Sequence, residues 1–198
     1  MGMPKVDFDK MYAEIEKADP KAITEYGITM NEKTIKIMQK HGYLQKDENR
    51  EEAIENNKEL LKKFKNFLKG RKDKEQIYSD IDWYSGCNEM SGHVLKFNEM
   101  DEEHFNYILF NRGIRKVMGM SVKDYLAVMD SLAVFGEFLK QEGFENGDVF
   151  LKVASQKDKM KERLREHERL NRLCDEGKIT EEKYGEKMEE LFRYGYME

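Results

Sequence analysis

Apolar side chains recur at helical spacing along most of the chain. Between Glu48 and Lys69 they fall three or four residues apart, which predicts one amphipathic helix that ends at Gly70. Residues 122–141 are apolar on nearly every side, as is typical of a helix surrounded by other helices. Ser121 directly precedes that run and predicts its N-cap. We therefore expect an all-α protein, a multi-helix bundle around the central apolar helix 122–141.

Start and stop signals divide the first part of the chain into short helices. The first helix is expected over residues 8–18. Asp19 is an N-cap residue followed by proline, which predicts a second short helix that ends at Gly27. Thr29 predicts the N-cap of a third helix, and Gly42 predicts its end. Three helices are therefore expected to open the chain.

Two further helices are expected beside the central one. Asp101 predicts the N-cap of a helix that continues to about Met118. From about Val149 to Glu176 the pattern predicts one long charged helix with a narrow apolar stripe, so this helix is expected to project. We divide the chain into a helical body, residues 1–150, and a C-terminal helical hairpin, residues 151–198.

The apolar stripe of the hairpin is its candidate interaction surface. Thr180 predicts the N-cap of the last helix, whose apolar residues can fold back on the helix before it. The function that we predict is non-enzymatic protein-protein interaction, as an adaptor or regulatory protein that binds another protein or a second copy of itself. The residues expected to carry it are Met160, Leu164, Leu170, Leu173, Tyr184, Met188, Leu191 and Phe192.

Within this hairpin, the segment Leu170–Phe192 reads LNRLCDEGKITEEKYGEKMEELF. It resembles the short helical hairpins called SHOCT modules, which pair a leucine-bearing helix with a Gly-x-Ile-Thr-Glu-Glu turn. That turn corresponds here to residues 177–182. The resemblance is confined to this segment, and it implies an oligomerisation or docking tail.

Composition excludes several classes of protein. The 11 Phe, 10 Tyr and 13 Met residues are too many for a disordered polyelectrolyte, although 75 of the 198 residues are charged (35 basic, 40 acidic). No apolar run is long enough to span a bilayer, and the first residues lack the apolar core of a signal peptide. The two cysteines lie far apart, as expected of reduced thiols. We expect a folded cytoplasmic protein with no membrane partner and no cofactor.

Charge changes sign along the chain in blocks. Lys58–Lys74 contains eight basic and two acidic residues, whereas Gln76–Asn111 contains one basic and seven acidic residues. The first interpretation is that neighbouring helices attract each other weakly through their exposed faces. The second interpretation is that complementary blocks promote self-association.

Residues 79–93 have the most unusual composition and are predicted to form a loop between two helices. They include the only Trp, and Cys87 with Glu89 and His93 could form a metal or enzymatic site if His104 completed it. The spacing matches no familiar zinc motif. The preferred interpretation is that the aromatic residues close the end of the bundle and that Cys87 is a small buried residue. No catalytic residue is predicted.

Residues 22–44 resemble a helix-turn-helix, with a turn at Gly27 followed by a helix that bears several lysines. The resemblance implies a DNA-binding regulator, which is the alternative function. No arginine is present in this segment to read guanine bases. The residues that would face DNA are Lys33, Thr34, Lys36 and Lys40.

Overall fold

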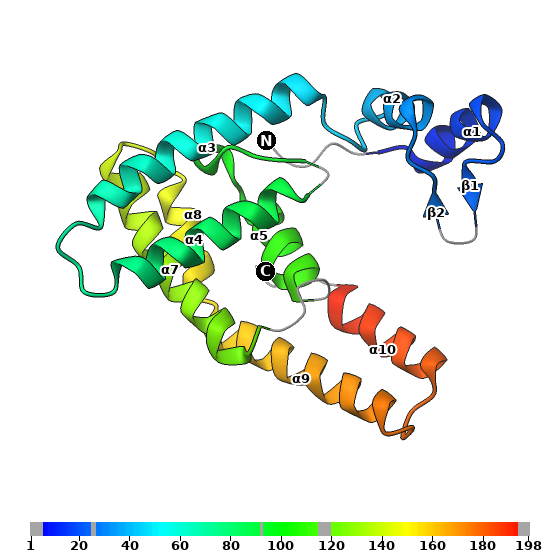
Figure 1. The fold of residues 1–198 in the computed structure, drawn as a ribbon. Coiled ribbons are helices and arrows are strands. Elements are labelled where there is room, and N and C mark those ends of the chain that lie inside the picture. Colours follow the sequence, from blue (N-terminus) through cyan, green and yellow to red (C-terminus); the bar gives the residue numbers. More distant parts are fainter. Residues whose placement is uncertain (1–5, 25–26, 92, 115–119, 194–198) are drawn as a thin grey trace.

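The computed structural model describes residues 6–24, 27–91, 93–114 and 120–193, and it is built almost entirely of helices (Figure 1). Within these ranges the only sheet has two strands, so the predicted all-α fold is confirmed. The elements are α1 (Phe8–Ala18), β1 (Ile23–Thr24), β2 (Gly27–Ile28), α2 (Glu32–Lys40), α3 (Asp47–Phe67), α4 (Lys74–Glu89), η1 (Phe97–Glu99), α5 (Glu102–Phe105), η2 (Asn106–Gly113), α7 (Val122–Gln141), α8 (Gly147–Ala154), α9 (Lys157–Asp175) and α10 (Glu181–Arg193).

The central helix of the main core is α7, as predicted. It packs against α3, α4, α8 and α9. Its fully buried Phe135 lies at the middle of an aromatic cluster, with ring centroids 4.8 Å from Phe64, 4.9 Å from Phe97 and 5.4 Å from Phe150. The three contacts are edge-on arrangements, which aromatic quadrupoles favour. One ring thus connects α7 with α3, η1 and α8.

Helices α7 and α8 approach each other at two glycines. A Cβ atom added to Gly136 would lie 2.9 Å from the carbonyl oxygen of Gly147, and one added to Gly147 would lie 2.6 Å from that of Gly136. Both distances are shorter than van der Waals contact. The two helices can therefore pack closely only because neither residue has a side chain.

The N-terminal unit, residues 6–44, has a hydrophobic core of its own. This core is formed by Met11, Ile15, Ala22, Ile37 and Met38 and is separate from the main core. In Figure 1 the unit lies beyond the start of α3, at the right of the molecule. The predicted helical body 1–150 therefore contributes to two cores, and the main core also includes Met160, Leu164 and Phe192 of the hairpin.

Polar contacts join the N-terminal unit to the body. The Nε2 atom of His93 donates to the carbonyl oxygen of Gly42 at 2.8 Å. The amide group of Gln45 both donates to and accepts from the backbone of Val94, at 3.0 and 2.9 Å. Segment 42–45 is thus held against the segment that follows α4.

The prediction of a helix between Asp19 and Gly27 is wrong, because a β-hairpin of β1 and β2 occupies this segment. Asp19 follows the end of α1, and its carboxylate accepts from the Asn31 side chain at 2.9 Å. It is therefore not an N-cap. The N-cap of α2 is Asn31 and not Thr29, since Asn31 exchanges hydrogen bonds with Thr34 in a capping box. The antiparallel pairing of Ile23 with Ile28 and of Thr24 with Gly27 supplies the backbone hydrogen bonds that a helix would otherwise form in this segment.

The loop predicted for residues 79–93 is also wrong, because helix α4 continues to Glu89. Polar residues on its buried side obscured the helical period. Asp80 is buried, and its carboxylate accepts from Ser131 Oγ at 2.6 Å and from Gln76 Nε2 at 2.7 Å. Burial of a polar residue is tolerated when hydrogen bonds satisfy it.

Two predicted helices are divided in the structure. The helix expected from Glu102 to about Met118 consists of α5 followed by the wider π-helical turns of η2, and residues 115–119 lie outside the described ranges. The expected long helix 149–176 is broken at Ser155 and Gln156, which separate α8 from α9. At this break Ser155 Oγ donates to the carbonyl oxygen of Lys152 at 2.6 Å, which competes with the helical pattern.

Candidate interaction surfaces

The candidate metal or catalytic residues have structural roles. Cys87 is buried in the main core, and Glu89 lies at the end of α4. The ring of His93 binds the carbonyl oxygens of Gly42 and Tyr43. Across the described ranges, no group of three or more His, Cys, Asp or Glu side chains could hold a metal ion.

His104 is fully buried and neutral near physiological pH. Asn88 both donates to and accepts from the backbone of Leu95, which fixes the orientation of its amide group. The Oδ1 atom of Asn88 must therefore accept from His104 Nε2 at 2.8 Å. Burial disfavours the charged imidazolium and lowers the pKa of His104 to about 4. This histidine connects α5 to Asn88 of α4 and cannot act as a proton donor at neutral pH.

The predicted DNA-binding residues do not form a helix-turn-helix. That motif joins its two helices by a turn of about 3–4 residues, whereas the hairpin of β1 and β2 separates α1 from α2. Thr34 is buried, and its hydroxyl donates to the carbonyl oxygen of Thr29 at 2.8 Å, so it cannot contact DNA. The lysines are exposed. Lys36 pairs with Glu32 at 2.7 Å, and Lys40 pairs with Glu14 at 2.7 Å.

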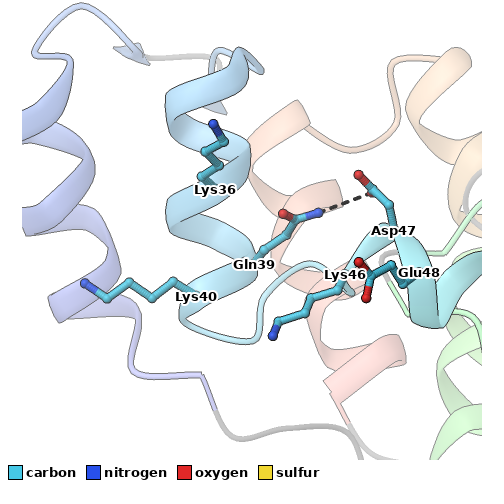
Figure 2. Close-up of a pocket in the computed structure, with 6 residues that line it drawn as sticks. All are labelled: Lys36, Gln39, Lys40, Lys46, Asp47 and Glu48. Carbon is cyan, nitrogen blue, oxygen red and sulfur yellow. Dashed lines mark hydrogen bonds between the residues drawn. The ribbon is translucent and has the colours of Figure 1, made fainter.

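An open cleft of about 630 Å³ lies between α2 and the start of α3. Figure 2 shows that two lysines of α2 and Lys46, which directly precedes α3, line it together with Gln39, Asp47 and Glu48. The Gln39 amide donates to Asp47 Oδ1 at 3.3 Å. Because charges of both signs line the cleft, it lacks the consistent sign that binds a small anion. The lining residues are Lys36, Gln39, Lys40, Lys46, Asp47 and Glu48.

The apolar stripe of the C-terminal hairpin is partly buried within the chain. The predicted packing of α9 against α10 is confirmed, and the hairpin extends from the body in Figure 1. Met160, Leu164 and Phe192 belong to the main core, and Leu170 is buried. Leu173, Tyr184, Met188 and Leu191 are half-buried. That these residues bind a partner stays a prediction.

Sequence reasoning did not identify an exposed aromatic surface on the N-terminal unit. Phe8, Tyr12 and Tyr43 are 50%, 42% and 42% exposed, and the ring centroids of Phe8 and Tyr43 are 5.8 Å apart. We call these three residues the aromatic face. A signal for it exists in the sequence. Phe8 and Tyr12 are four residues apart on α1, as are Met11 and Ile15, and only the second pair enters the small core.

Comparison of the chain with protein-family models, with curated proteins and with solved structures gave no match. In the part of the chain that the structure describes, no helix is long and apolar enough to cross a membrane.

Proposed function

We propose that this chain is a non-enzymatic adaptor that binds a protein partner through the aromatic face of its N-terminal unit. The observation that carries the proposal is the joint exposure of Phe8, Tyr12 and Tyr43. Phenylalanine and tyrosine are enriched in protein interfaces, where tyrosine often contributes much of the binding energy. The aromatic face has the composition of such an interface.

The exposure of these rings is not a requirement of folding. The core of the N-terminal unit is complete without Phe8 and Tyr12, because Met11 and Ile15 supply the buried side of α1. Scattered single apolar residues are normal on surfaces, but here two rings are in direct contact and a third lies one helical turn away. A grouped set of this kind supports a binding surface.

The hairpin is the weaker candidate for the same role. Four of its eight apolar side chains are buried and the other four are half-buried, so the hairpin exposes less apolar surface than the aromatic face does. The aromatic face is exposed in the fold as it stands, and preorganised surfaces bind at a lower cost.

Site-specific photo-crosslinking tests the proposal. A photoreactive amino acid is placed at Tyr12 and, as a matched control, at Glu186, which is exposed on α10. In cells, the probe at Tyr12 is expected to give discrete covalent adducts with protein, and the probe at Glu186 is not. Replacing Phe8 and Tyr43 by Ala should remove the adducts. Equal adducts at both positions, or none at Tyr12, would contradict the proposed function.

A further inference from the structure

We propose that the aromatic face and its flanking carboxylates bind the row of lysines on α3 of a second copy of this chain. This inference rests on the proposed function and adds the identity of the partner. It joins two surfaces that lie on different parts of one molecule and have opposite charge.

The first surface lies on α1. Asp9, Tyr12 and Glu16 follow each other at intervals of three and four residues, so they share one side of the helix, next to Phe8. All four side chains are exposed. In contrast to Glu14, which pairs with Lys40, neither Asp9 nor Glu16 forms an ion pair with any described residue. The surface therefore places one aromatic ring between two available carboxylates.

The second surface lies on the C-terminal half of α3. Lys58, Lys62 and Lys65 are exposed and follow each other at intervals of four and three residues, so they too share one side of a helix. The ammonium group of Lys65 already lies 5.5 Å from the ring centroid of Tyr78, which shows that a lysine of this row can engage an aromatic ring. Lys58 and Lys62 form no ion pair with any residue in the described ranges.

The two surfaces match in length. The outer members of each set are seven residues apart, which corresponds to about 10 Å along a helix axis. In an antiparallel arrangement the ammonium of Lys62 would lie over the ring of Tyr12. Lys58 would then face Glu16, and Lys65 would face Asp9. The aliphatic stems of the lysines would cover the rings of the aromatic face.

The contact requires two molecules. The helix α3 extends away from the N-terminal unit, and its lysine row lies toward the far end (Figure 1). Lys58 is about 16 Å along the axis from the start of α3, and Lys65 is about 27 Å from it. The aromatic face of one copy therefore reaches the lysine row of another copy and not its own.

Sedimentation velocity on the full chain tests the inference. At about 50 mM NaCl the mean mass should rise above that of one chain as concentration increases, and at about 500 mM NaCl it should fall to one chain, because salt screens exposed charges. Lys58→Glu with Lys65→Glu should abolish association, and so should Asp9→Lys with Glu16→Lys. Combining all four substitutions should restore it, since the charges are then exchanged.

The control pair is Glu186→Lys with Glu189→Lys on α10. It changes the net charge by the same amount as Asp9→Lys with Glu16→Lys, and it should leave association unchanged. Tyr12→Phe should retain association, and Tyr12→Ala should reduce it at least tenfold, which separates the ring from the hydroxyl. A single-chain mass at low salt, or failure of the combined variant to restore association, would overturn the inference. Adducts from Tyr12 to a different protein would then leave the proposed function intact.

Discussion

The guanidinium of Arg163 on α9 lies 5.2 Å from the ring centroid of Phe192 on α10, and its Nη2 atom donates to the carbonyl oxygen of Leu191 at 2.6 Å. Its Nη1 atom donates to the carbonyl oxygen of Phe110 in η2 at 2.7 Å. Arg163 is itself buried. One side chain therefore connects both helices of the hairpin with the body.

Replacing Arg163 by Met should destabilise the protein by about 2–4 kcal/mol. The buried carbonyl group of Phe110 and the partly buried carbonyl group of Leu191 lose their donors, and the ring of Phe192 loses its cationic partner. Urea unfolding measures the loss, and hydrogen exchange should show the largest increase in α10. The control is Arg165→Met, which removes an exposed arginine two residues away. Equal effects of the two substitutions would contradict the connecting role of Arg163.

Truncation of leucines in the hairpin should have unequal effects. Leu170 is 1% exposed, so Leu170→Ala should lower the free energy of unfolding by about 2–5 kcal/mol. Leu173 is half-buried, so Leu173→Ala should lower it by less. The expected result in hydrogen exchange is that the distal part of α9 and α10 opens before α7 does. If α7 opened together with the hairpin, the two would form one cooperative unit.

Gly136→Ala or Gly147→Ala should destabilise the packing of α7 against α8 by about 1–3 kcal/mol, because the new methyl group would meet backbone atoms that cannot rotate away. The matched control is Gly86→Ala on α4. Nothing lies within 4 Å of the methyl group there, so this change should stabilise the protein by up to about 1 kcal/mol. Thermal unfolding measures both effects, and the melting temperature should fall for Gly136→Ala or Gly147→Ala and rise for Gly86→Ala.

The stability of the protein should fall on acidification through the range in which His104 titrates. The pKa of this histidine is about 4 in the folded state and about 6.5 when exposed, so the unfolded state binds a proton first as the pH falls. The stability that the neutral imidazole contributes is fully present above pH 6.5 and is lost progressively toward pH 4. The loss is at most about 3 kcal/mol.

The measurement is urea unfolding of the natural protein and of a His104→Gln variant at several pH values between those limits. The carboxylates make the same contribution to the pH dependence of stability in both proteins, so the difference between the two free energies of unfolding reports on His104 alone. A difference that stays constant from pH 6.5 to pH 4 would contradict the assignment of a buried neutral imidazole.

Local features of the sequence determined where many helices begin and end. The predicted bounds of α1 and α7 agree with the structure, because capping and apolar periodicity act within one or two helical turns. Gly70 and Gly177 have positive φ angles of 90° and 64°, as expected of glycines that terminate helices. These choices depend on neighbours in the chain and can be predicted without a fold.

The tertiary structure decided which side of each helix is buried. Both apolar pairs of α1 have helical spacing, and the packing of α2 and Ala22 against one side of α1 places Met11 and Ile15 in the core and leaves Phe8 and Tyr12 exposed. Asp80 hid the helical period of α4 because its partner Ser131 is 51 residues away. Burial depends on what lies opposite a side chain in space, and the order of residues along the chain does not contain that information.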